Sequence, residues 1–234
     1  MKESKPSAAD HGQHTTDVLI GYYQKMLLRL RPQKWWPART RLGVILGAIL
    51  TQNTSWANVE LAMRQLRHAG LLKLGRLRQA TRAEIEAAIR PAGFYRQKAQ
   101  TIQTFIAWLD RSYHGSLHAL FACPPQDLRR ELLLLRGLGS ETVDAILLYA
   151  ARKPFFVADA YTRRILSRHG LAPQGADYDS VQEFLHRHLP PDPALFNEFH
   201  ALLVEVGKRH CKRQAACCQG CPLEEFLPGG LPAW

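Results

Sequence analysis

The stretch LRGLGSET, residues 135–142, lies between two segments with helical patterns, 126–135 and 141–152. Two glycines spaced Gly-x-Gly let the chain turn tightly and expose backbone N–H groups. The free amides and the positive dipole end of the following helix point into that turn. We therefore expect Gly137, Gly139 and Ser140 to hold a phosphate through main-chain donors, independently of base sequence. A plain corner between two helices is the alternative.

Outward from this turn, apolar residues follow the helical period almost throughout. Alternating Val, Ile and Thr runs are missing, apart from a short strand-like piece at 155–158. Thr81 and Glu84 have the spacing of a capping box. The predicted helices cover residues 18–30, 42–50, 56–67, 81–90, 98–110, 126–135, 141–152, 159–168, 181–188 and 194–210. About ten helices without a sheet predict an all-α architecture.

Composition and charge exclude several protein classes. The chain has 234 residues, of which 46% are hydrophobic, too many for whole-chain disorder. The longest apolar stretch, 42–50, is far shorter than the roughly 20 residues of a membrane span. Residues 1–17 are polar and lack the apolar core of a signal peptide, so we expect a cytoplasmic protein. The net charge of +11 favours an anionic partner, nucleic acid above all, although a solubility role is the alternative.

An acidic residue, Asp159, follows an apolar run in VADAY, residues 157–161. It opens the predicted helix at 159–168, where an acid ordinarily serves as an N-cap. By itself this position therefore predicts a structural role.

Four blocks together resemble the endonuclease III-like helix–hairpin–helix (HhH-GPD) superfamily of DNA glycosylases. They are LGAILTQNT at 46–54, RPAGFYRQKA at 90–99, LRGLGSET at 135–142 and VAD at 157–159. They occur in the family's order, and the resemblance spans roughly residues 20–221. It implies a six-helix domain at 41–153 and a second helical domain from 17–40 plus 154–234, with a DNA-binding cleft between them. Residues 1–16 are expected to form a flexible tail.

The resemblance also implies a chemistry. In lyase members of the family, a lysine in the second hairpin helix attacks the sugar C1′. Glu141 stands at that position here, and Lys153 is about three helical turns away. We therefore expect a monofunctional glycosylase without efficient AP-lyase activity. Asp159 would stabilise the oxocarbenium-like sugar and activate water at C1′.

The aromatic cluster resembles one branch in particular, the 3-methyladenine DNA glycosylase III type. WWP at 35–37 and the tryptophan after the LTQNT block are similar to residues that contact the flipped base in that branch. The resemblance thus assigns Trp36, Pro37 and Trp56 to a base pocket, where indole faces would attract a cationic alkylated purine. Packing between helices is the alternative role.

Two further residues receive roles from the resemblance. Gln52 would fill the gap left by the flipped nucleotide, and Lys208, in VGK at 206–208, would lie at the mouth of the active site and contribute to the base pocket. A polar loop residue and a solvated lysine are the alternatives.

Four of the five cysteines cluster near the end of the chain: Cys211, Cys217, Cys218 and Cys221. Cys211-x6-Cys218-x2-Cys221 resembles the first three ligands of the family's [4Fe–4S] loop, but Leu227 stands at the fourth position. Cys217 is the only spare thiol nearby. A bound cluster, loss of the cluster, and zinc with His210 as a ligand all stay open.

These observations predict a base-excision repair DNA glycosylase that acts as a monomer on double-stranded DNA containing damaged bases. The alternatives are an oxidised-pyrimidine glycosylase/AP lyase and a non-catalytic protein that binds damaged DNA.

Overall fold

The structure is a computed structural model that describes residues 8–38 and 40–232. Helices dominate this part of the chain, and its only β-type pairing is an isolated bridge between Cys211 and Ala216. The predicted all-α architecture is therefore confirmed. None of the described helices is long and apolar enough to span a membrane.

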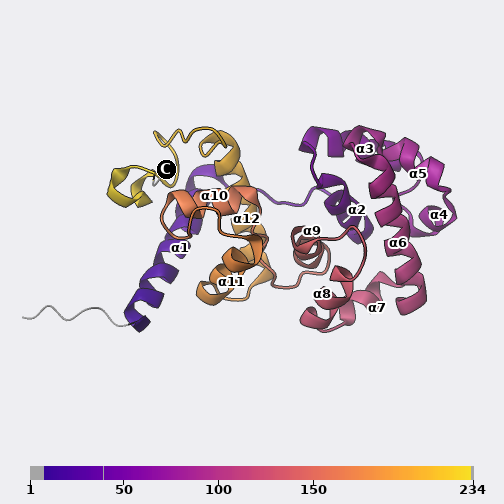
Figure 1. The fold of residues 1–234 in the computed structure, drawn as a ribbon, viewed down its shortest axis with the longest axis horizontal. Coiled ribbons are helices and arrows are strands. Elements are labelled where there is room, and N and C mark those ends of the chain that lie inside the picture. The colour runs from indigo at the N-terminus through magenta and orange to yellow at the C-terminus, as the bar shows by residue number, and fades with distance from the viewer. Residues whose placement is uncertain (1–7, 39, 233–234) are drawn as a thin grey trace, which may run out of the picture. The chain divides into compact units, whose positions relative to one another are not determined.

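The chain divides into two compact units. The central unit comprises residues 36–153, and the terminal unit combines the residues up to 35 with those from 154 onward. In Figure 1 the terminal unit therefore unites the indigo start of the chain with its orange and yellow end. Residues 36–38 and 40, which the resemblance assigned to the second domain, cluster with the central unit instead.

The central unit is built around α2 (Arg41–Thr51), in which residues 42–50 are all buried. Thr40 caps this helix by accepting a hydrogen bond from the Gly43 N–H. Helices α3, α6 and η2 pack against it. The other helices of this unit are α3 (Trp56–His68), α4 (Leu74–Gln79), α5 (Arg82–Ile89), η1 (Arg90–Ala92), α6 (Tyr95–Tyr113), α7 (Leu117–Ala122), α8 (Pro125–Leu133), α9 (Ser140–Ala145) and the π-helix η2 (Ile146–Ala150).

The structure refines the predicted helices of this unit. The capping box between Thr81 and Glu84 is present and opens α5. Helices α4 and α7 were not predicted, because six residues are too few for the apolar period to show. The segment predicted as one helix over 141–152 ends at Ala150, and its second half has π geometry.

The terminal unit contains α1 (Ala8–Leu30), α10 (Ala160–Arg168), α11 (Tyr178–His188), α12 (Pro193–Arg209) and the short turns η3 (Glu224–Phe226) and η4 (Pro228–Gly230). Helix α1 packs against α11 and α12, and α10 packs against α12. Gly207 permits the last contact, because a Cβ there would collide with the Tyr161 side chain.

Residues 8–16, which were expected to belong to a tail, are part of α1, because this helix begins at Ala8. Asp17 lies inside this helix, where the Gln13 side-chain amide donates to its carboxylate at 2.9 Å. This pair, one turn apart, stabilises the first turns of the helix. Residues 1–7 lie outside the described part of the chain.

The strand-like piece at 155–158 is buried but forms no strand. Side chains of α11 replace the missing strand partner. The Phe156 N–H donates to His186 Nε2 at 2.8 Å, and Gln182 donates to the Phe156 carbonyl at 2.6 Å. These bonds satisfy buried backbone groups that would otherwise be unpaired. They also anchor the segment that leads into Asp159.

Candidate active site and nucleic-acid-binding residues

Asp159 is the N-cap of α10, where its Oδ1 accepts a hydrogen bond from the Thr162 N–H at 2.8 Å. Its side chain is 14% exposed, so the carboxylate is reachable from solvent. Burial raises the pKa of this carboxyl, but the charge of His200 and the hydrogen bonds from His200 and Thr162 outweigh that effect and lower it overall. Asp159 therefore caps α10, as expected for an isolated acid at this position. It also presents an ionised carboxylate that solvent can reach.

His200 on α12 faces the second oxygen of this carboxylate. Its Nε2 lies 3.5 Å from Asp159 Oδ2, and the residue is only 7% exposed. The sequence analysis did not single out His200, because it lies among apolar residues on a helix and its partner is 41 positions away. The only available signal was a titratable residue on an otherwise apolar face.

The helix–hairpin–helix consists of α8, the turn at 134–139 and α9. Gly137 has a φ of +94°, and a Cβ there would collide with the Thr101 side chain, so the turn requires glycine. Gly139 is the N-cap of α9 and offers no side-chain cap to its amides. Nothing lies within 4 Å of where its Cβ would be. The space beside Gly139 at the start of α9 is therefore open, and phosphate binding by this turn stays a prediction.

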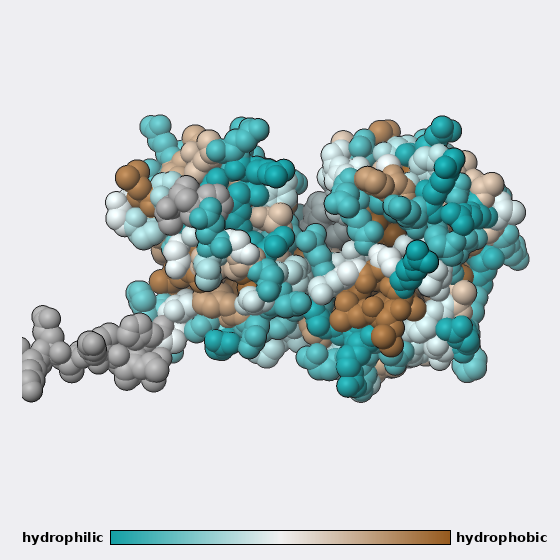
Figure 2. Space-filling model, in the orientation of Figure 1, coloured by the Kyte–Doolittle hydropathy of each residue, from teal (hydrophilic) through white to brown (hydrophobic). Residues whose placement is uncertain are grey.

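A buried ion pair holds the two hairpin helices together. Arg129 on α8 donates to both carboxylate oxygens of Asp144 on α9, at 2.7 and 3.0 Å. Asp144 is completely buried. Leu134, the C-cap of α8, is 84% exposed, and Figure 2 shows apolar surface gathered around α8.

Gln52 lies against the hairpin. Its side-chain amide donates to the Gly137 carbonyl at 3.0 Å and to the Thr142 hydroxyl at 2.8 Å. The loop after α2 and the hairpin are therefore joined, although they are 85 to 90 residues apart in sequence. The role of Gln52 in the DNA stack stays a prediction.

A cavity of about 630 Å³ lies beside Gln52, and it is lined mainly by polar and basic side chains from α5, α6 and the hairpin. Phe94 stands at this cavity, 61% exposed and with a φ of +46°. Phe94 belongs to the 90–99 block that resembles the family, but the resemblance assigns it no role. The sequence signal for it was an aromatic residue directly after a glycine.

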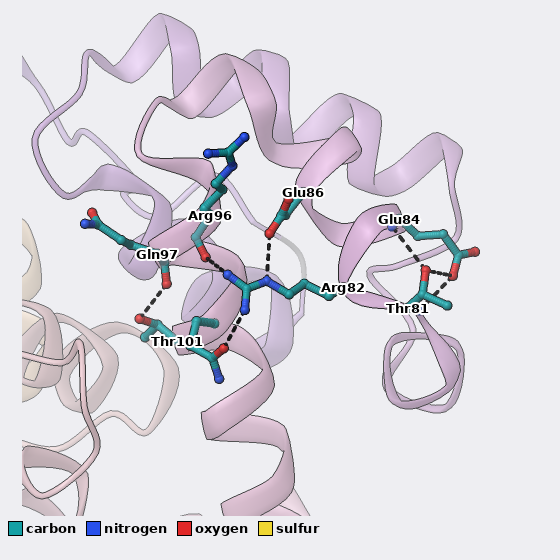
Figure 3. A network of polar contacts seen from close by, with 8 residues as sticks. Thr81, Arg82, Glu84, Glu86, Arg96, Gln97 and Thr101 are labelled. Atoms are coloured by element: carbon teal, nitrogen blue, oxygen red, sulfur yellow. Dashed lines mark hydrogen bonds and ion pairs between the residues drawn. The ribbon is translucent and has the colours of Figure 1, made fainter.

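Two hydrogen-bond networks hold the walls of this cavity. Figure 3 shows the first, in which Arg82 of α5 donates to Glu86 and, on α6, to the Arg96 carbonyl and the Gln100 side chain. In the second, the buried Lys98 Nζ donates to the carbonyls of Leu50 at 2.9 Å and Ala92 at 2.8 Å. Lys98 thereby joins the end of α2 to the Phe94 turn.

Trp36 and Trp56, both predicted to contact the base, lie together in the central unit with Tyr149. The ring centroid of Trp36 is 5.4 Å from that of Trp56 and 5.2 Å from that of Tyr149. Trp36 also rests on Gly47 of α2, where an added Cβ would lie 2.8 Å from the indole. Tyr149 was missed by the sequence analysis. It belongs to the π-helix η2, a geometry that often marks functional sites.

The remaining predicted residues lie in different places. Pro37 is exposed, and Lys208 is exposed in the last turn of α12. Glu141 lies in the first turn of α9. Lys153, the nearest alternative amine in sequence, donates to the Cys123 carbonyl at 2.7 Å.

Three of the candidate cluster ligands line one small cavity of about 20 Å³: Cys211, Cys218 and Cys221. Leu227 is also part of its wall, and Cys217 is exposed. Arg168 donates to Cys211 Sγ at 3.3 Å, and burial raises the pKa of Cys221 to about 11. Among the described residues, no three Cys, His, Asp or Glu side chains form a group that could hold a metal ion. Leu227 leaves a four-cysteine cluster without its fourth thiolate, and His210, the histidine of the zinc alternative, also lines this cavity, so both ligand sets stay predictions.

Comparison with known proteins identifies the family to which this fold belongs. The model of the HhH-GPD superfamily of base excision DNA repair proteins matches residues 46–191. A protein of Methanocaldococcus jannaschii, named as a DNA repair glycosylase, is 40% identical over 211 residues, which cover 89% of this chain and 92% of the relative.

Solved structures are similar over most of their length. A 3-methyladenine DNA glycosylase of H. pylori bound to 1,N6-ethenoadenine is 26% identical, with a TM-score of 0.72 over 83% of this chain and 97% of that one. An endonuclease III trapped in a covalent intermediate with DNA shares the fold at 23% identity, with a TM-score of 0.76 over 94% of this chain and 96% of that one. The chain therefore belongs to the HhH-GPD superfamily and is a DNA repair glycosylase of that family.

Proposed function

We propose that the protein is a monofunctional glycosylase that hydrolyses the N-glycosidic bond of a flipped alkylated purine, such as 3-methyladenine, in double-stranded DNA. Two observations carry the proposal. An ionised, accessible carboxylate is present at Asp159, while Glu141 stands where a lyase would need an amine.

The Asp159 carboxylate supports hydrolysis at C1′. Because its pKa is lowered, it carries a negative charge at neutral pH. That charge stabilises the positive sugar that forms as the base departs, and a carboxylate oxygen orients and deprotonates the attacking water. A methylated purine such as 3-methyladenine is already cationic, so it leaves without an acid to protonate it. A single carboxylate therefore suffices for this substrate class.

The aromatic group of Trp36, Trp56 and Tyr149 supports a cationic base. Electron-rich ring faces attract cations by about 0.5–2 kcal/mol, more when water is excluded. Glu60 adds negative charge next to this group by accepting a hydrogen bond from the Trp56 indole at 3.0 Å. The similarity to a 3-methyladenine DNA glycosylase agrees with this substrate class.

The hairpin and the cavity beside Gln52 support binding to DNA. The amides of α9 would hold a phosphate, and Arg96 and Arg136 line the adjacent cavity. Gln52 would occupy the space of the flipped nucleotide. The exposed Phe94 fits a wedge between base pairs, a role that apolar side chains play in kinked DNA. Lys208 would contact the substrate from the terminal unit.

The test uses methylated duplex DNA, with unmethylated duplex as the control. We expect release of free methylated purine and strand breakage only after hot alkali, because hydrolysis leaves an intact abasic site. Strand breakage without alkali, especially on DNA with oxidised pyrimidines, would instead identify a glycosylase/AP lyase. Tight binding without base release would identify a non-catalytic damage-binding protein, and either result would overturn the proposal.

A further inference from the structure

We propose that His200 is a positioning residue for base excision, which holds the Asp159 carboxylate in its reactive orientation. The proposal rests on the function proposed above, in which Asp159 acts at C1′. It assigns a role to a residue that otherwise belongs to the packed face of α12.

The positions of the two Asp159 carboxylate oxygens support this role. A carboxylate has two oxygens, and its plane is fixed only when both have partners. The Thr162 N–H binds Oδ1 at 2.8 Å, and this bond alone leaves the position of Oδ2 to rotation about the last side-chain bond. His200 Nε2 lies 3.5 Å from Oδ2. Contacts of this length in the free protein commonly shorten when substrate binds.

The placement of His200 supports this role as well. Its ring meets the Phe156 ring edge to face, with centroids 6.4 Å apart and planes at 89°. Phe156 is three residues before Asp159, and its backbone is bound on both sides by α11. The imidazole is therefore fixed against the same segment that carries the carboxylate. A preorganised partner of this kind keeps a catalytic group aligned without ordering it during the reaction.

The burial of a polar ring at position 200 also supports this role. Phe199, Ala201 and Leu202, the neighbours of His200 on α12, are buried apolar residues, so packing alone would be served by a phenylalanine. A buried imidazole instead requires a polar partner. Of the titratable groups around this segment, Asp159 faces Nε2 from the start of α10, whereas His186 of α11 binds the Phe156 N–H.

The experiment compares three variants with the parent in single-turnover release of methylated purine. His200→Phe keeps the ring shape but has no N–H donor, and His200→Gln keeps a donor at nearly the same reach. His188→Phe is the matched control, since His188 also packs against a phenylalanine, Phe184, at 4.9 Å. We expect His200→Phe to lower the rate about 10- to 100-fold at unchanged DNA affinity. His200→Gln should recover most of that loss, and His188→Phe should equal the parent.

The pH dependence gives a readout that a purely structural role would not move. Because the charge and hydrogen bond of His200 lower the pKa of Asp159, His200→Phe should shift the acidic limb of the rate profile to higher pH. Circular dichroism and thermal unfolding show whether each variant is folded. If His200→Phe is unfolded, His200→Gln is compared with the parent in the same assay and in its pH profile, where loss of the His200 charge should still shift the acidic limb to higher pH.

The outcomes separate the two proposals. A folded His200→Phe with the parent's rate and pH profile overturns the role of His200, and so does a folded His200→Gln that is as slow as His200→Phe. If His200→Phe does not fold, a folded His200→Gln with a rate more than about 10-fold below the parent also overturns it. If Asp159→Asn alone keeps the full rate of base release, the proposed function itself fails, whatever His200 does.

Discussion

Among the aspartates whose exposure the structure describes, each unit holds one with little or no exposure, and the two have different surroundings. In the central unit, Asp144 is completely buried and both of its oxygens are bound by Arg129 within 3.0 Å. In the terminal unit, Asp159 keeps 14% of its side chain exposed and has a backbone N–H and a looser contact to His200. A carboxylate that is fully enclosed by a strong partner serves stability. One that is ionised, oriented and still accessible can act on a substrate.

The largest expected effect is the loss of base release when Asp159, the accessible one of the two aspartates, is replaced. Asp159→Asn should lower base release by at least about 10²–10³-fold, because an amide cannot stabilise the positive sugar. Asparagine is as good an N-cap as aspartate, so the free energy of unfolding should hardly change. Single-turnover assays on methylated DNA and urea unfolding measure the two quantities. A stable variant with parental turnover would show that Asp159 is only a cap.

The next effect concerns Asp144. Arg129→Met should reduce the free energy of unfolding by about 3–5 kcal/mol, because it removes the charged partner of a carboxylate in the interior. Arg130→Met is the control on the same helix, since Arg130 pairs with Asp127 at the surface. That pair should contribute less than about 1 kcal/mol. Equal effects of both substitutions in urea unfolding would contradict a structural role for the buried pair.

A smaller effect tests the aromatic group. Gly47→Ala adds a methyl group 2.8 Å from the Trp36 indole, which must then shift. We expect about a 10-fold loss in release of methylated purine, while the added helix propensity of alanine limits the loss of stability to about 1 kcal/mol or less. Gly75→Ala is the control, because nothing lies near its Cβ position in α4. Unchanged turnover in Gly47→Ala would remove Trp36 from the proposed pocket.

The smallest effect concerns Lys98, whose burial lowers its pKa from 10.5 to about 8. Between these values the unfolded chain keeps a proton that the folded chain has released. The free energy of unfolding therefore rises with pH, by at most about 1.4 kcal/mol per pH unit from this group. Because the raised pKa of Cys221 acts in the opposite direction, the measurement is the difference in pH slope between the parent and Lys98→Met. Identical slopes in urea unfolding would contradict the lowered pKa.

The hairpin, the capping box and most helices could be predicted because local spacing specifies them. Gly-x-Gly requires a turn, Thr81 and Glu84 are three residues apart, and a long apolar period has few alternatives to a helix. The same local reasoning missed α4 and α7 and placed the start of α1 too late. Short helices carry too little pattern, and a polar first half of α1 does not reveal that it is helical.

The candidate site was predictable only in part. Asp159, Trp36 and Trp56 carry a resemblance in their own sequence blocks, whereas His200 and Tyr149 become informative only beside their neighbours. By contrast, the family spacing put Leu227 at the fourth ligand position, and the structure finds it with Cys211, Cys218 and Cys221 around one small cavity.

The order of residues alone established the helical class, the helix–hairpin–helix and the acid at 159, since each depends on neighbours within one or two turns. Packing decided which of these residues have partners. Gln52 reaches the hairpin across 85 positions, and His200 reaches Asp159 across 41. Such contacts depend on how distant helices pack, and no local spacing encodes the distance between two side chains on separate helices.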